Sequence, residues 1–503
     1  MSNETRESRS PLDMSSDEFR LIGHSLIEQI ASFYETLPER RITSAGTADA
    51  VRQNLGTGEL PEFGMDAGEL LAEVVPKLFE NSLHNGHPKF LGYVTSSAAP
   101  LGALADLLAA AVNANVSKWE LSPFASEIES QTVRWIADLV GYGRDCGGLM
   151  VSGGNMANFL GFVAARCRVA PWDVRSEGIY GGSQRMTAYA SEETHTWIQK
   201  AADVCGLGTD SIRWIKTDGE GRMILDELEE RLVEDRRNGC LPFLVVATAG
   251  SVSTGAIDPI RQMAELCREQ AVWFHVDGAY GAPAAVLPEA PEELHSLNLA
   301  DSIAIDPHKW LYCPLEAACV LTRHEDALKK AFSFRPDYYH FDDDDSSGTS
   351  FYEHGMQNSR GFRALKVWLA LRRAGRQGYR DSIRGDIRLA QLLHKTVDAH
   401  PEFEARTLNL SIATFRYVPS GLNSEAAADY LNGLNKALLG RLQKDGQLFL
   451  SNAVVGGEYL LRACIVNFRT TATDVNEIPA IIVKEGRRLH ELMSPAVECY
   501  RTG

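Results

Sequence analysis

Apolar runs with high β propensity alternate with helical stretches between about residues 86 and 325. The runs are Leu149–Val151, Met186–Ala190, Phe243–Ala247, Val272–Val276, Ser302–Ile305 and Cys319–Thr322. Because strands that are joined by helices return to one sheet by crossovers, this alternation predicts a mostly parallel sheet with helices on both faces. Ligands bind beyond the carboxyl ends of the strands in such sheets. Polar motifs follow several of these runs, so we expect a binding site at that edge.

Two regions of different character flank this α/β region. In residues 1–85 a polar start is followed by a helix that Ser15 or Ser16 caps, with apolar residues at helical spacing: Phe19, Ile22, Leu26, Ile30, Phe33 and Leu37. A lone helix cannot bury such a face, so we interpret residues 1–85 as an arm that packs on another body, such as a second subunit.

Residues 326–503 are predicted to form a smaller α+β domain. A loop with four consecutive aspartates comes first, and a long helix over about 362–399 follows. We then expect a strand over 403–417, a helix over 424–444, strands over 447–455 and 459–468, and a last helix from about 475.

Composition limits the classes of partner. The 503 residues carry a net charge of −17, which argues against nucleic acid or an anionic membrane surface as a partner. No run of 18 apolar residues and no apolar signal segment is present, so we expect a cytoplasmic protein. The nine cysteines form no CxxC pair, which favours free thiols and gives no reason to expect a metal site.

The first two polar motifs stand early in the region. Ser152-Gly153-Gly154-Asn155 follows Leu149–Val151 and precedes a helical stretch to Arg168. Paired glycines at a helix N-terminus can surround an anion with N–H groups, although a tight turn with an asparagine cap has the same pattern. His195 follows the run ending at Ala190; it could stack on a flat cofactor or serve as a helix cap.

The other two motifs bring opposite charges to strand ends. Asp277 ends the run Val272–Val276, where a partly desolvated carboxylate needs a cation such as a protonated pyridine nitrogen; alternatively it caps the turn at Gly278. Lys309 follows Ser302–Ile305 in Asp306-Pro307-His308-Lys309-Trp310. Burial would lower the pKa of this lysine and suit it to Schiff-base formation, whereas most lysines are surface residues.

The four motifs together fit one cofactor. Asp277 precedes Lys309 by 32 residues, with a glycine-rich turn and His195 upstream. Pyridoxal 5′-phosphate (PLP) needs a cradle for its phosphate, a carboxylate for its ring nitrogen, a lysine for its aldehyde and a flat partner for its ring.

These motifs also resemble those of a known family, the group II PLP-dependent decarboxylases, which include the aromatic-L-amino-acid decarboxylases. His-Val-Asp-Gly-Ala-Tyr at 275–280 and Asp-Pro-His-Lys-Trp at 306–310 carry the resemblance. Further matches are His87-Pro88, Pro123 to Glu129, Thr248 to Ser251, and Ser359-Arg360 leading into 364–368. The resemblance runs from about residue 16 to the C-terminus.

The resemblance implies a fold and a role for each site residue. It implies the type I PLP-dependent (aspartate aminotransferase-like) fold and a homodimer with active sites at the subunit interface. Lys309 would be the Schiff-base lysine, Asp277 the partner of the ring nitrogen and His195 the stacking residue. The other expected cofactor contacts are Gly153, Gly154, Asn155, Thr248, Ala279 and His308; asparagine at 155 departs from the serine or threonine usual in the family.

The implied reaction is loss of the α-carboxylate of an L-amino acid to give an amine and CO₂. Tyr338 matches the tyrosine that returns a proton to Cα in this family. In related plant enzymes a phenylalanine at that place accompanies oxidation to an aldehyde, so Tyr338 favours simple decarboxylation. A transaminase or a carbon–carbon lyase on the same fold is the alternative.

The substrate is less narrowly defined by the sequence. The expected pocket residues are His84, Tyr93, Thr95, Ala114, Val116 and Val252, with Ala114 and Val116 contributed by the partner subunit. The pocket is apolar and has no arginine that marks an acidic side chain. Aromatic amino acids (tryptophan, tyrosine, phenylalanine or DOPA) are therefore favoured, and aliphatic ones such as leucine or valine come next.

Overall fold

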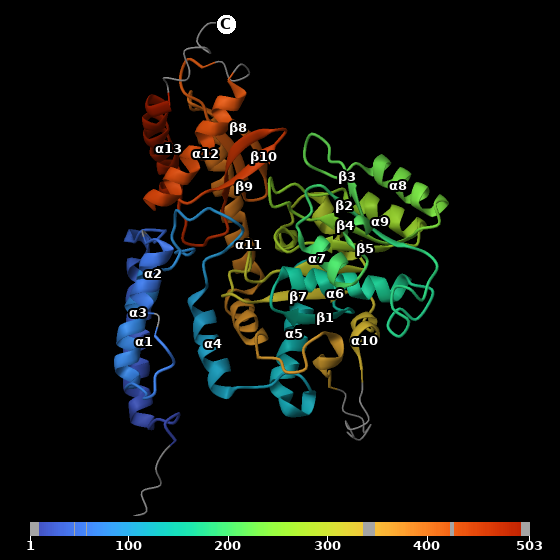
Figure 1. Cartoon of the computed structure of the whole chain (residues 1–503), viewed down its shortest axis with the longest axis horizontal. Helices are drawn as coiled ribbons and strands as arrows, with labels where there is room; N and C mark the ends of the chain where they lie inside the picture. Colours follow the sequence, from blue (N-terminus) through green and yellow to red (C-terminus); the bar gives the residue numbers. More distant parts are fainter. Residues whose placement is uncertain (1–9, 45, 57, 335–347, 423–426, 494–503) are drawn as a thin grey trace, which may run out of the picture.

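The α/β region is built around a seven-stranded sheet (Figure 1). The structure is a computed structural model that describes residues 10–44, 46–56, 58–334, 348–422 and 427–493. The strands of the sheet, in the order β1-β7-β6-β5-β4-β2-β3, are β1 (Gly147–Val151), β7 (Ala318–Thr322), β6 (Ser302–Ile305), β5 (Trp273–Asp277), β4 (Leu241–Thr248), β2 (Met186–Ser191) and β3 (Ile212–Ile215). Only β7 runs antiparallel to its neighbours. The expected mostly parallel sheet and its six expected strands are confirmed.

Strand β3 was not expected from the sequence. It is a four-residue edge strand that pairs only with β2. Arg213 and Trp214 in its middle are not buried, so the apolar run that marks the other strands is missing.

Helices cover both faces of the sheet. On β4, Val245 and Ala247 belong to one core cluster, which includes residues of α5 (Pro123–Leu139) and α9 (Ile260–Glu269). Leu244 and Val246 belong to the other, which includes residues of α6 (Gly154–Val169) and α7 (Trp197–Val204). Successive side chains of β4 therefore face opposite cores, as they do in a parallel sheet with helices on both faces. Helices α8 (Leu225–Arg237) and α10 (Ala327–Phe332) also contribute residues to these two clusters.

The N-terminal helices stand to one side of the sheet. These are α1 (Ser16–Thr36), α2 (Ala48–Leu55), α3 (Ala67–Glu80) and α4 (Pro100–Val112), and α1 and α3 lie side by side at the left of Figure 1. The expected cap of α1 is confirmed, since Ser15 accepts from the Glu18 N–H and Glu18 accepts in return from Ser15. No residue of α1 is fully buried within the chain, so its apolar face is covered only in part.

The C-terminal region contains a four-stranded antiparallel sheet in the order β10-β11-β9-β8. Its elements are α11 (Ala364–Asp398), β8 (Phe403–Asn409), β9 (Ile412–Tyr417), α12 (Ala428–Asp445), β10 (Ser451–Val455), β11 (Glu458–Cys464) and α13 (Ala472–Met493). The small α+β domain is confirmed, while the expected domain limits near residues 85 and 325 stay predictions. No helix in the described part of the chain is long and apolar enough to cross a membrane.

The single strand expected over 403–417 is wrong. The chain reverses at Leu410, which has a φ of 49°, and forms the hairpin β8–β9. The turn contains no glycine or proline, and for that reason local sequence patterns did not indicate it.

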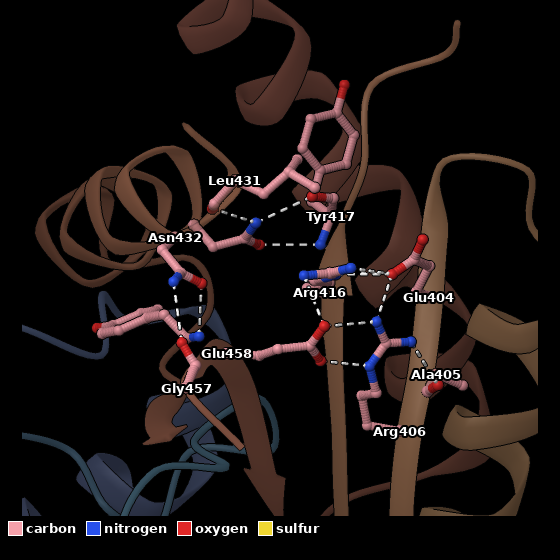
Figure 2. A network of polar contacts seen from close by, with 11 residues as sticks. Glu404, Ala405, Arg406, Arg416, Tyr417, Leu431, Asn432, Gly457 and Glu458 are labelled. Carbon is pink, nitrogen blue, oxygen red and sulfur yellow. Dashed lines mark hydrogen bonds and ion pairs between the residues drawn. The ribbon is translucent and has the colours of Figure 1, made fainter. Parts of the chain in front are cut away.

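Four charged side chains join this hairpin to β11, as Figure 2 shows. Arg406 donates to Glu458 (2.6 Å) and to Glu404 (2.5 Å). Arg416, only 3% exposed, pairs with both Glu404 (2.6 Å) and Glu458 (2.9 Å). Because each carboxylate contacts both guanidinium groups, the four side chains link three strands in one ion-pair network.

Candidate active site

Lys309 lies in the turn that follows β6, and its ammonium group faces a carboxylate. Its Nζ is 3.0 Å from Asp306 Oδ2. Burial acts to lower the pKa of Lys309, but the charges of Asp306 and Asp277 outweigh burial and raise it. The lowered pKa expected from the sequence is therefore wrong, because the sequence did not show that Asp306 would pair with the lysine.

Asp277 is the last residue of β5, next to the strand that leads to Lys309. The side chain is 8% exposed. Its Oδ2 accepts from Asn158 Nδ2 (3.1 Å) and from Trp197 Nε1 (2.8 Å), and its Oδ1 accepts from the Ala279 N–H (3.2 Å). The contact with the Ala279 N–H is the turn cap that the sequence allowed as an alternative. The two donors from α6 and α7 show that the carboxylate also binds side chains outside this turn.

His195 follows β2 and is exposed on the same side of the sheet. Desolvation by its surroundings lowers its pKa, the charge of Asp277 raises it, and Lys309 lowers it again. Because β2, β5 and β6 run parallel, His195, Asp277 and Lys309 come at the carboxyl ends of these strands and lie at one edge of the sheet.

The glycine-rich turn is at the N-terminus of α6, where an anion site was expected. Gly153 is the N-cap residue, Gly154 begins the helix and Asn155 is exposed. A Cβ on Gly154 would lie 2.6 Å from Asp306 Oδ2. Only glycine therefore lets this turn come so close to the turn that carries Lys309. A Cβ on Gly153 would have His308 Cε1 at 4.0 Å as its nearest contact, which places the histidine beside the turn.

Two buried oxygens in this region have no hydrogen-bond partner among the described residues: Thr248 Oγ1 and Asp306 Oδ1. Buried polar atoms are rarely left unpaired, so both indicate a missing polar group. Thr248 ends β4 beside Asp277, and Ala279, two residues after Asp277, is buried. A hydroxyl donor, a helix N-terminus, a lysine and a carboxylate at one edge fit the phosphate, aldehyde and ring nitrogen of PLP.

The expected substrate-pocket residues divide into accessible and inaccessible ones. Tyr93 and Val252 are 54% and 47% exposed, and Thr95 and Ala114 are half-buried. Val116 is fully buried within its own chain, and His84 is held by the carbonyl groups of Arg41 and Phe79. The structure therefore does not bring His84 and Val116 to an open surface. Tyr338 lies outside the described residues.

Three further residues near the site were missed by the sequence analysis. Asn158 and Trp197 contact Asp277, and an asparagine among the apolar residues of α6 was the available signal. Arg462 on β11 is 1% exposed; its Nη1 donates to the Tyr93 carbonyl (3.0 Å), while Nε and Nη2 have no hydrogen-bond partner in the described part of the chain. For Arg462 the available signal was an arginine inside the apolar run from Leu460 to Val466.

Comparisons with known proteins agree with this geometry. The pyridoxal-dependent decarboxylase conserved domain matches residues 58–418. An aromatic-L-amino-acid decarboxylase of Bacillus atrophaeus is 33% identical over 93% of this chain and 95% of its own. A phenylacetaldehyde synthase of a Rosa hybrid cultivar is 29% identical over 89% and 90%. A crystal structure of Oryza sativa TDC with PLP and tryptamine superposes with a TM-score of 0.88 at 26% identity, covering 96% of this chain and all of that one.

The fold and the matched domain define an enzyme of the PLP-dependent class. Within that class, the chain belongs to the pyridoxal-dependent decarboxylase family and is a carboxy-lyase with PLP as its cofactor. Family membership also favours decarboxylation over the transaminase and carbon–carbon lyase alternatives.

Proposed function

We propose that the protein removes the α-carboxylate of an aromatic L-amino acid and releases the corresponding amine and CO₂. The observation that carries this proposal is the meeting of Lys309, Asp277 and the α6 N-terminus at one sheet edge, in a chain 33% identical to an aromatic-L-amino-acid decarboxylase. The exposed Tyr93 and Val252 offer apolar surface near this edge. PLP, when bound, supplies a conjugated ring that accepts the electrons left at Cα as CO₂ departs.

The residues of the chain have separable roles in this proposal. Gly153, Gly154 and Thr248 bind the phosphate with N–H and hydroxyl donors, and His308 lies beside them. Asp277 would pair with the ring nitrogen and keep it protonated, and His195 would lie against the ring. Lys309 would hold the cofactor through its aldehyde. Because Asp306 and Asp277 both raise its pKa, pairing of Asp277 with the ring nitrogen would help free the amine from its proton.

Arg462 is the candidate partner of the substrate carboxylate. A buried guanidinium group in which two nitrogen atoms, Nε and Nη2, have no hydrogen-bond partner among the described residues needs an anion. Its Nη1 donates to the carbonyl of Tyr93, one of the expected pocket residues. An α-carboxylate has the charge and the planar shape that a guanidinium group pairs with.

The test is to incubate the PLP-loaded enzyme with each of the twenty amino acids and DOPA and to measure amine and CO₂. We expect tryptophan, tyrosine, phenylalanine or DOPA to give the highest kcat/KM and Lys309→Ala to give no turnover. Borohydride reduction and peptide mapping should place the cofactor on Lys309. A higher kcat/KM for leucine or valine would contradict the proposed substrate, and labelling of another lysine would contradict the site.

Oxidative formation of an aldehyde is the second candidate, because a relative 29% identical is a phenylacetaldehyde synthase. Tyrosine rather than phenylalanine at position 338 favours the amine. Measurement of aldehyde and hydrogen peroxide in the same incubations separates the two.

We also propose that the enzyme is a cytoplasmic homodimer in amino-acid metabolism. Large apolar side chains are exposed on three N-terminal helices: Phe19 and Leu21 on α1; Leu70, Val74 and Leu78 on α3; Leu104, Leu107, Leu108 and Val112 on α4. A second copy would bury them. The eight described cysteines are free thiols, which fits a reducing compartment.

A further inference from the structure

A chain of hydrogen bonds leads away from Asp277 into the core. Asn158 Nδ2 donates to Asp277 Oδ2 (3.1 Å), and Asn158 Oδ1 is 2.7 Å from His275 Nε2. On the other side of the ring, His275 Nδ1 is 2.7 Å from Ser302 Oγ, which accepts from Trp273 Nε1 (2.8 Å). The chain thus joins strands β5 and β6 and helix α6 behind the carboxylate.

The chemistry of its members gives this chain one direction. The Asp277 carboxylate can only accept, so the asparagine amide turns Nδ2 toward it and Oδ1 toward His275. The hydrogen of the imidazole is then on Nε2 and points at Asn158 Oδ1. His275 Nδ1 is left as an acceptor, so the Ser302 hydroxyl donates to it while accepting from the Trp273 indole, which can only donate. The opposite tautomer would set two lone pairs against each other between His275 and Asn158.

The members of the chain are shielded from solvent. His275 and Ser302 are fully buried and Asn158 is 2% exposed. Desolvation lowers the pKa of His275 to about 4, although the charge of Asp277 opposes this, so the imidazole is neutral at ordinary pH. A buried chain of neutral dipoles has one low-energy arrangement, because each reversal would leave a polar atom unpaired.

Helix α6 leaves room for this imidazole at a single glycine. A Cβ on Gly161 would be 2.8 Å from His275 Cε1 and Nδ1 and 3.2 Å from Ser302 Oγ. The backbone of α6 therefore packs directly on the imidazole ring. The same helix carries Asn158 and begins at the glycine-rich turn.

We propose that His275 and Asn158 are positioning residues that act through Asp277: their directed hydrogen bonds hold Oδ2 and so set the strength of the contact between the carboxylate and the cofactor's ring nitrogen. This inference rests on the proposed role of Asp277. The hydrogen bond from Asn158 reaches a charged acceptor in a buried place, where such bonds are at their strongest.

The test compares two ligands that differ at one atom. Apoprotein is titrated with PLP and with the analogue in which a C–H group replaces the ring nitrogen. Asn158→Leu and His275→Leu break the chain at successive links. His275→Gln is the conservative control, because a glutamine amide can place an N–H donor where His275 Nε2 lies. Circular dichroism checks that each variant is folded.

We expect the two leucine variants to weaken PLP binding about tenfold, the size of one lost hydrogen bond to a charged group, and the analogue much less. His275→Gln should keep most of the affinity for PLP. Equal weakening of both ligands would show a merely structural role and overturn the inference, as would unchanged PLP binding in Asn158→Leu. If wild-type protein and Asp277→Asn show the same preference for PLP over the analogue, the result contradicts the proposed contact between Asp277 and the ring nitrogen instead.

A second perturbation reaches the chain from the helix. Gly161→Ala should displace His275 and reproduce the selective loss of PLP affinity. Gly440→Ala on α12 is the matched control, because no atom lies within 4 Å of a Cβ there. If the two alanine variants bind PLP alike, the packing of α6 on His275 has no part in positioning Asp277.

Discussion

Asp277 has three N–H donors around its carboxylate, from Asn158, Trp197 and Ala279. An asparagine at this position would have nearly the same shape, but its amide group has a neutral oxygen on one side and a donor on the other. The donors that now converge on two oxygens would then meet an N–H group. A single uncharged replacement thus changes both the charge and the hydrogen bonds.

We expect Asp277→Asn to lower kcat by about 10² or more, because electrostatic contacts of this kind stabilise a transition state by a few kcal/mol. PLP should also bind more weakly. Steady-state kinetics at saturating PLP and a cofactor titration measure the two effects. Full activity in this variant would remove the argument that the carboxylate maintains the ring nitrogen as an electron acceptor.

Tyr338→Phe removes one hydroxyl group and tests proton delivery to Cα. CO₂ release should continue in part while amine formation falls, and aldehyde, ammonia and hydrogen peroxide should appear because the carbanion becomes open to oxygen. Tyr339→Phe is the neighbouring control. Measurement of amine, aldehyde and oxygen uptake decides, and a switch to aldehyde in the Tyr339 variant alone would reassign the donor.

At the scale of elements, helix α11 holds the turn that carries Lys309. Asp386 of α11 accepts from Trp310 Nε1 (2.9 Å) and from the Tyr312 hydroxyl (2.7 Å). The carboxyl is 3% exposed and no cation is within ion-pair distance in the described part of the chain. Burial raises the pKa of Asp386 to about 7, against the hydrogen bonds of Tyr312 and Trp310, which lower it.

This raised pKa makes stability depend on pH. Between the ordinary value of 3.8 and about 7 the folded chain keeps a proton that the unfolded chain has lost. The free energy of unfolding from this group therefore falls as pH rises through that window. We expect Asp386→Asn, which keeps an acceptor and cannot ionise, to have a Tm that rises relative to wild type between pH 5 and pH 8. Thermal unfolding at both values measures this, and a constant difference would show that the group does not titrate there.

At the scale of the whole molecule, the apolar surface of the N-terminal helices needs a partner. Leu78 on α3 and Leu108 on α4 are 61% and 53% exposed. In Figure 1 α3 stands away from the seven-stranded sheet, whereas α4 packs on α11 and buries only Gly102 and Ala105. Large exposed apolar patches on soluble proteins mark interaction surfaces.

We expect sedimentation analysis to give twice the chain mass of 55.3 kDa for the wild type. Leu78→Glu combined with Leu108→Glu should shift the equilibrium to the monomer, because charges cannot be buried in an apolar interface without partners. Val204→Glu, at a residue 73% exposed at the end of α7, is the control and should leave the mass unchanged. A wild-type monomer would contradict the homodimer.

Local patterns were enough to predict much of the architecture. Strand ends at Asp277 and Ile305, the cap at Ser15 and the glycine turn at 153–154 depend on residues that are close in sequence. Propensity, capping and the period of apolar residues act over such short distances, so the sequence by itself determined the sheet, its covering helices and the strand ends at which the site lies.

Which residues of the site contact one another follows only from the folded chain. Asn158 meets Asp277 across 119 residues of sequence, and Arg462 meets Tyr93 across 369. The pKa of Lys309 rises rather than falls because folding brings two carboxylates to it, and the chain turns at Leu410 without a glycine or proline. Electrostatic strength, burial and unpaired donors depend on which groups become neighbours in space, and spacing along the chain does not determine that.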